Sequence, residues 1–221
     1  MHITLAGDPL AFEGDFETHV TVRGDRTDVD HLERWAAGAE LKLTLITLGR
    51  GRVPVQPMIT LRGSGTLGAQ YTAAGVVVGR LETAGFEVAR VKIEASPCTR
   101  GVPGDDEAAL RLGAGCYFEH HVKLLLDAGC DVAALTRLVV PHGAHVSWNA
   151  RRVLDPGRHE RFVTQRCHGL GLAAAGKSLE ELCTMLYECG YEIVSVEREF
   201  VVFDSDASLD AGWIERNAIR A

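Results

Sequence analysis

The sequence predicts an α+β protein that is an internal duplication of two ferredoxin-like halves, each with the element order β-α-β-β-α-β. Alternating and helical stretches recur in the same order, and short motifs recur with them. Phe16-Glu17-Thr18-His19-Val20 corresponds to Phe118-Glu119-His120-His121-Val122. The other matched pairs are Thr60-x-Arg62 with Thr164-x-Arg166 and Gly85-Phe86-Glu87 with Gly190-Tyr191-Glu192. The offset between equivalent residues grows only from 102 to 105, which indicates a duplication.

Hydrophobic periodicity places the elements of the first half, residues 1–95. The predicted strands are 16–22, 41–48, 58–62 and 86–94. The predicted helices are 29–39, capped by Thr27-Asp28, and 67–84, which ends before Gly85. A polar residue before a helix and a glycine after it are the usual signals for its two ends.

Residues 96–115 interrupt the pattern with Pro97, Gly101, Pro103 and Gly104, so we expect a linker or a long surface loop. The second half, 116–203, repeats the order. Its predicted strands are 118–126, 144–152, 161–166 and 191–203, with a turn at 155–157. One helix follows Asp131 and stops at Pro141, and another ends at Cys189. The tail, 204–221, is polar apart from Trp213 and Ile214, and we expect it to cover a sheet edge or a partner surface.

Composition narrows the classes of protein. The 221 residues, 46% hydrophobic and 24% charged, are ordinary for a globular protein of one large or two small domains. A net charge of −7 argues against bulk attraction to nucleic acid or to an anionic membrane. We expect no secretory signal, because residues 1–8 lack a basic segment followed by an apolar core, and the longest apolar run (73–78) is too short to span a bilayer. We expect a cytoplasmic protein whose six cysteines are reduced and mostly buried. A zinc site at Cys167 and His168 is disfavoured, because adjacent side chains diverge in a strand.

Alternation places polar side chains on one face of each predicted sheet, opposite the face that the helices cover. In the first half this open face carries Glu17, His19, Thr21, Lys42, Thr44, Thr60, Arg62, Lys92 and Glu94. In the second half it carries Glu119, His121, Lys123, His145, Ser147, Thr164, Arg166, Glu197 and Glu199. Antiparallel sheets often expose such a face to water. The favoured interpretation is that the two faces meet and enclose a polar cleft, because histidines and arginines recur at matched positions.

A cleft of this kind predicts an enzyme for a small anionic substrate, with a phosphorylated one favoured. His19 and His121 would divide the general acid and general base roles. Arg62 and Arg166 would clamp the oxygens of the anion. The other predicted substrate-binding residues are Thr21, Thr60, Lys123, His145 and Thr164.

Two alternatives stay open. Glu17, His19, Glu119 and His121 form a ligand set that suits Fe, Mn, Ni or Zn, so a divalent metal is the candidate cofactor of a metal-dependent enzyme. The other alternative is a non-catalytic binding or assembly module, whose polar faces lie in water or pair in a homodimer.

Short resemblances also point to phosphate chemistry. His19-Val20-Thr21-Val22 resembles the H-x-T-x motif of the 2H phosphoesterases, which are bilobed duplications with one motif in each lobe. The second copy, His121-Val122-Lys123-Leu124, has lysine where that family has Thr or Ser. His145-Val146-Ser147-Trp148 restores the motif, but on a strand that is not equivalent. Glu119-x-His121-x-Lys123 is similar to the E-x-E-x-K strand of CYTH-type triphosphate enzymes, with the second Glu replaced.

The segment from Gly171 to Ser178 matches the phosphate-binding pattern G-x-x-x-x-G-K-[ST]. Its Leu-Ala-Ala-Ala insert favours helix, and the equivalent segment 65–74 lacks Gly-Lys-Ser. The predicted fold is also not the parallel sheet in which such loops occur. Lys177 is therefore expected to lie in solvent near a helix start, and nucleotide binding here is a minor alternative.

Overall fold

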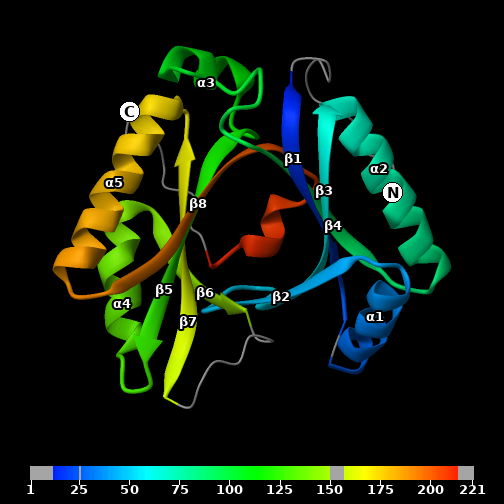
Figure 1. Ribbon diagram of the computed structural model, residues 1–221, viewed down its shortest axis with the longest axis horizontal. Coiled ribbons are helices and arrows are strands. Elements are labelled where there is room, and N and C mark those ends of the chain that lie inside the picture. The colour runs from blue at the N-terminus through cyan, green and yellow to red at the C-terminus, as the bar shows by residue number, and fades with distance from the viewer. Residues whose placement is uncertain (1–11, 25, 150–156, 214–221) are drawn as a thin grey trace.

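The computed structural model describes residues 12–24, 26–149 and 157–213, and eight strands close into one barrel with helices outside it (Figure 1). The first half comprises β1 (Glu13–Val22), α1 (Arg26–Gly38), β2 (Lys42–Leu48), β3 (Val55–Thr66), α2 (Leu67–Thr83) and β4 (Val88–Ala95). The rest comprises α3 (Asp106–Leu112), β5 (Tyr117–Asp127), α4 (Val132–Val139), η1 (Val140–His142), β6 (Ala144–Asn149), β7 (Arg158–His168), α5 (Leu172–Glu188), β8 (Glu192–Asp204) and η2 (Ala207–Asp210). The duplicated α+β fold is confirmed.

The strand order around the barrel is β1-β3-β2-β6-β7-β5-β8-β4. Each half contributes four neighbouring strands, and two antiparallel seams join the halves. β2 pairs with β6 from Ile46 to Leu48, and β4 pairs with β8 from Lys92 to Ala95. The two sheets are therefore continuous and also face each other, so the expected cleft is the interior of a barrel.

Two hydrophobic cores lie between the helices and the outer face of the barrel. The first gathers buried residues of β1, β3, β4 and α2, among them Val20, Ile59 and Leu81. The second gathers residues of β5, β7, α4 and α5, among them Val122, Val163 and Leu182. A fully buried side chain of this size contributes about 1.5–3 kcal/mol. Because the apolar face of each strand is used outside, the alternating polar residues point into the barrel.

With one exception, the residues at the ends of the helices are those that the sequence predicts. The Asp131 side chain accepts a hydrogen bond from the Ala134 amide at the start of α4 (3.0 Å). Gly85 and Gly190 follow α2 and α5 with φ of 87° and 83°, a conformation that glycine adopts at little cost. The cap predicted at Thr27-Asp28 is wrong, because α1 already begins at Arg26 and Asp28 lies in its first turn.

Two further local predictions need correction. The linker 96–115 contains the helix α3, which Asp105 caps. Strict alternation along the predicted strand 191–203, with Glu197 and Glu199 on the open face, would place Val194 in the second core, but its side chain is 50% exposed and Ile193 packs there instead. The cause is a register shift opposite Lys123 and Leu124, which breaks the alternation of β8.

The cysteines are free thiols, but of the six only Cys167 is buried, so the expectation of mostly buried thiols is wrong. The helices of the described ranges are all too short or too polar to cross a membrane. The predicted strand residues 150–152 and most of the turn 155–157 lie outside the described residues.

The tail does not cover a sheet edge. In Figure 1 the segment around η2 lies in the middle of the ring of strands. The Arg52 amide donates to the Ala211 carbonyl (2.9 Å), and the buried indole of Trp213 donates to the Val146 carbonyl (3.0 Å). Residues 205–213 therefore fill part of the barrel interior.

Candidate functional site

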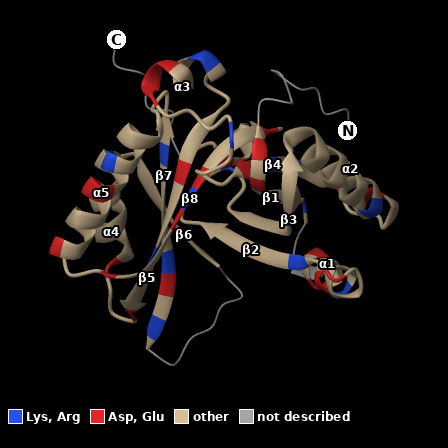
Figure 2. Ribbon diagram, turned by 45° about the horizontal axis from the view of Figure 1, so that its top comes forward, with Lys and Arg blue, Asp and Glu red and all other residues tan. Residues whose placement is uncertain are grey.

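The barrel encloses a polar cavity of about 290 Å³, to which all eight strands and the tail contribute. Charged residues lie on the strands of the ring as well as on the helices (Figure 2). Of the predicted site residues, the cavity is lined by Glu17, His19, Thr21, Glu119, His121, Lys123, Thr164 and Arg166. Both histidines therefore line the same cavity.

In the first half, three strands assemble a Thr–His–Glu arrangement. His19 on β1 lies opposite Thr60 on β3, and Glu94 comes from β4 on the other side of β1. The Nδ1 atom of His19 is hydrogen-bonded to Thr60 Oγ1 (3.1 Å), and Nε2 is 3.0 Å from Glu94 Oε2.

The second half repeats this arrangement. His121 Nδ1 is hydrogen-bonded to Thr164 Oγ1 (3.0 Å), and Nε2 is 3.3 Å from Glu199 Oε2. The same nitrogen is 3.4 Å from Glu119 Oε1. We call the sets Thr60–His19–Glu94 and Thr164–His121–Glu199 the two triads. The sequence placed Glu94 and Glu199 on the open face but did not select them as site residues, although their offset of 105 matches that of the duplication.

Lys92 connects the first triad to Glu119, the carboxylate beside His121 of the second triad. Its ammonium group is 2.6 Å from Glu94 Oε1 and 2.7 Å from Glu119 Oε1. Burial lowers the pKa of Lys92, but the charges of Glu119 and Glu94 outweigh burial and raise it. The equivalent position in the second half is Glu197. The duplication is therefore asymmetric at this point, and the first half supplies the cation.

His121 is held in its protonated form. Burial opposes its charge, but hydrogen bonds and charges from Glu119 and Glu199 outweigh burial and raise the pKa to about 10. Glu119 has a pKa well below its usual range, because Arg166 and Lys92 outweigh its burial. At neutral pH the ring of His121 is therefore a cation that donates from both nitrogens, and it has no free lone pair with which to act as a base.

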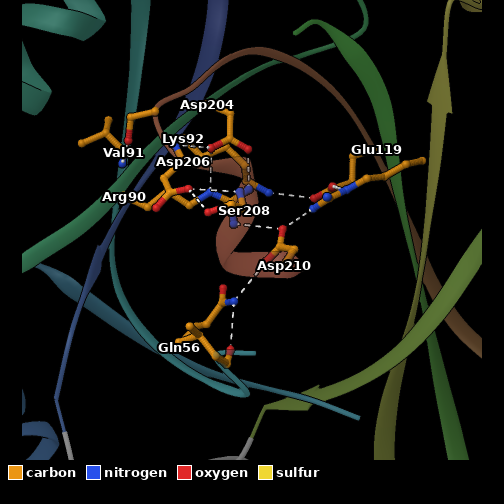
Figure 3. A network of polar contacts seen from close by, with 12 residues as sticks. Gln56, Arg90, Val91, Lys92, Glu119, Asp204, Asp206, Ser208 and Asp210 are labelled. Atoms are coloured by element: carbon orange, nitrogen blue, oxygen red, sulfur yellow. Dashed lines mark hydrogen bonds and ion pairs between the residues drawn. The ribbon is translucent and has the colours of Figure 1, made fainter. Parts of the chain in front are cut away.

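A second network centres on Asp210 of the tail (Figure 3). Arg90 Nη1 and Arg166 Nη2 donate to Asp210 Oδ2 at 3.0 and 2.7 Å, and Gln56 Nε2 donates to Oδ1 at 3.0 Å. Arg90 also donates to both oxygens of Asp204. Burial raises the pKa of Asp210, but the two arginines outweigh it and lower the pKa. No pattern in the tail predicts that its aspartate enters the barrel.

The two predicted arginines do not converge on one anion. Arg62 donates to Glu17 Oε2 (2.8 Å), and its side chain is 76% exposed. It does not line the cavity but an adjoining groove of about 590 Å³, which shares Glu17, Glu197 and Glu199 with the cavity. Arg166 makes the equivalent contact with Glu119, but it is buried and also held by Asp210. Both guanidinium groups therefore already have a carboxylate partner.

Of the remaining predicted residues, Lys123 faces the cavity and His145 does not line it. The Lys123 ammonium lies 5.4 Å from the centre of the Phe162 ring. His145 is buried beside Trp213, and burial, with the charges of Arg50 and Arg166, lowers its pKa to about 4. It is a neutral interior side chain at pH 7.

The predicted metal ligands do not gather as one set of four. Instead Glu94, Glu119 and His121 have donor atoms within 4.8 Å of one another. The Lys92 ammonium already occupies the position between the two carboxylates where a cation would bind. Cys167 and His168 belong to no such group in the described part of the chain, and the His168 ring packs against Tyr117 at 4.5 Å.

The phosphate-loop alternative is wrong. Helix α5 begins at Leu172, so most of the segment 171–178 is helical and cannot form a cradle. The Gly171 amide donates to Asp106 Oδ1 (2.8 Å) and the Leu172 amide to the Pro103 carbonyl (2.9 Å). The residues around α3 therefore already use the first amides of this segment.

No protein-family model matches the chain, and no curated protein does. Among solved structures, the small subunit of acetolactate synthase from Thermotoga maritima aligns at 12% identity with a TM-score of 0.30, over 85% of this chain and 94% of that one. A mutant chlorite dismutase from Candidatus Nitrospira defluvii aligns at 13% identity with a TM-score of 0.26, over 87% and 93%. Likenesses this low do not bear on function, so the site itself has to carry the proposal.

Proposed function

We propose that the barrel cavity binds a small anionic compound, with a phosphate ester as the favoured class, and that the two histidines transfer protons to and from it. The observation that carries the proposal is the repeated triad. Each half presents a histidine, oriented by a threonine and a glutamate, to the same cavity. Oriented histidines in an enclosed polar site are suited to general acid–base chemistry.

The two histidines would have different roles. His121 is protonated at neutral pH, so it stabilises negative charge on the ligand and is the candidate for donating a proton to it. His19 is the candidate for accepting a proton, with Glu94 beside Nε2 to stabilise the imidazolium that forms. This division follows from the second carboxylate near each ring. Glu119 Oε1 is 3.4 Å from His121 Nε2, whereas its counterpart Glu17 Oε1 is 3.8 Å from His19 Nε2.

Lysines supply the attraction for the anion. Lys42 and Lys123 line the cavity, and within the described ranges neither forms an ion pair with a carboxylate. Arg90, Lys92 and Arg166 are neutralised by neighbouring acids. A phosphate would therefore gain most from the two lysines and from the hydroxyl of Thr21.

Titration calorimetry with inorganic phosphate and turnover of p-nitrophenyl phosphate test the proposal. We expect Lys123→Met to weaken phosphate binding, and His19→Gln and His121→Gln to lower kcat by about 10²–10⁴-fold. His31→Gln is the matched control, because His31 lies exposed on α1, away from the cavity. The proposal fails if phosphate does not bind, or if both triad variants turn over the ester as the wild type does.

A metal-dependent enzyme is the second candidate, favoured by the cluster of Glu94, Glu119 and His121. Lys92 opposes it, because its ammonium group already neutralises both carboxylates. Elemental analysis of the purified protein is the test. Stoichiometric metal that is lost in a Glu119→Gln variant would favour this candidate over the first.

An assembly role is the third candidate, favoured by the edge of β8. β8 pairs with β5 from Glu192 to Val201, but with β4 only from Phe200 to Asp204. Residues 192–199 therefore have one edge without a strand partner in the described structure. Val194 and Val196 there are 50% and 41% exposed. An unpaired edge with exposed valines is a site for strand addition.

The partner we propose for this edge is a second copy of the chain. If two β8 strands pair antiparallel about Ser195, Glu192 lies opposite Arg198 and Val194 opposite Val196. Sedimentation equilibrium tests this, with Val196→Lys expected to be monomeric. Val76→Lys is the control, because Val76 is 59% exposed on α2. A monomeric wild type would eliminate this candidate.

A further inference from the structure

The cavity has one charged wall and one mixed wall. All lining side chains from β1, β4, β5 and β8 are polar or charged. Among the described residues, the apolar lining comes from β2, β3, β7 and the tail. It consists of Ile46, Leu48, Met58, Phe162 and Trp213. Because the seam of β4 with β8 and the seam of β2 with β6 lie on opposite sides of the barrel, the two kinds of lining face each other.

The pairing of neighbouring strands shows where the cavity lining changes from charged to apolar. Lys123 on β5 pairs with Phe162 on β7, Phe162 pairs with Ser147 on β6, and Ser147 pairs with Leu48 on β2. This row crosses four neighbouring strands and runs from a cation, through an aromatic ring and a hydroxyl group, to an apolar side chain. The ammonium group of Lys123, 5.4 Å from the Phe162 ring, marks the boundary.

Strand β2 repeats the change along its own length. Its cavity-lining residues are Lys42, Thr44, Ile46 and Leu48 in that order, so the strand passes from polar to apolar along the cavity. A strand face that only had to meet water would keep its polar residues to the end. Apolar side chains on the inner face of a polar barrel are instead suited to an apolar part of a ligand.

From these two gradients we infer that the ligand is amphipathic: a phosphate monoester of a small aromatic or alkyl alcohol. Its phosphate lies near Lys123, Lys42 and the histidines. Its organic group lies against Phe162, Met58 and Ile46. The inference rests on the proposed function and adds the class of the esterified group. The cavity of about 290 Å³ limits that group to roughly the size of a single ring.

Calorimetric titration with phenyl phosphate and with inorganic phosphate, on the same protein, tests the inference. We expect phenyl phosphate to bind at least about tenfold more tightly, because its ring leaves water. Phe162→Ala should bring the two Kd values close to each other. The ratio of the Kd values is the measured quantity, because the Phe162 ring also contacts Lys123, and circular dichroism shows that the variant is folded. Phe162→Leu, the matched control, should retain part of the advantage.

The outcomes separate the inference from the proposed function. Equal Kd values for the two ligands in the wild type would overturn the inference and leave anion binding intact. An advantage for phenyl phosphate that survives in Phe162→Ala would overturn the assigned position of the ring. If neither ligand binds, the proposed function is wrong and the inference falls with it.

Discussion

Asp210→Asn tests whether the tail holds the barrel interior together. The substitution preserves the shape of the side chain and removes its charge. In the folded protein that charge faces Arg90 and Arg166, and all three side chains are less than a tenth exposed. The asparagine amide would place two donors where the carboxylate accepted hydrogen bonds from the arginines.

The size of the effect follows from these contacts. Removing one member of a buried ion pair costs about 3–5 kcal/mol, because the remaining charge stays buried without its partner. Here Arg90 keeps Asp204 and Arg166 keeps Glu119, so we expect the lower end of the range. A loss of about 3 kcal/mol corresponds to a fall in Tm of roughly 6–12 °C for a protein of this size.

Urea unfolding at pH 7, followed by circular dichroism, measures the change. Glu107→Gln is the control: it breaks an exposed ion pair with Arg111 on α3, and such pairs contribute about 0–1 kcal/mol. The pKa of Asp210 is lowered on folding, so its contribution is present above the pKa of the unfolded chain, about 3.9. The difference in the free energy of unfolding between variant and wild type should therefore narrow as the pH falls below about 4. A variant as stable as Glu107→Gln would refute the reasoning.

Three further predictions concern His121, Lys92 and α5. His121 should stay protonated until the pH nears 10, so its contribution to stability, complete below the unfolded pKa of about 6.5, is lost as the pH rises toward 10. NMR titration checks this, and a ring that titrates near 6.5 would contradict it. Lys92→Met should bind Zn²⁺ at least about tenfold more tightly than the wild type by calorimetry, because two carboxylates lose their ammonium partner. An unchanged affinity would contradict the interpretation that Lys92 occupies the position of a cation between these carboxylates. Gly171→Ala should cost about 1–3 kcal/mol, because a Cβ there would lie 2.3 Å from the Asp105 backbone. Gly176→Ala should stabilise α5 by about 0.5–1 kcal/mol, because the space around Gly176 is open. Chemical denaturation measures both glycine substitutions, and equal effects would be inconsistent with this packing.

Local information predicted the elements and the inner face of each strand. Alternation of Thr60 and Lys92 with apolar neighbours is a property of a single strand, so it can be seen without the fold. The duplication was visible for the same reason, because equivalent residues keep nearly the same offset. The bulge at Val194 could not be seen, since it depends on how β8 pairs with β5.

The amino-acid sequence by itself determined that the protein is two copies of one unit, with a histidine and a threonine at matched positions of each polar face. Tertiary structure decided that the two faces close into one barrel, through seams between strands that are distant in sequence. It also decided that Glu94 and Glu199 complete the triads, that Lys92 bridges Glu94 and Glu119, and that Asp210 enters the interior. These contacts join residues up to 154 positions apart. Side-chain periodicity reports which face a residue occupies, but not which distant residue it will meet there.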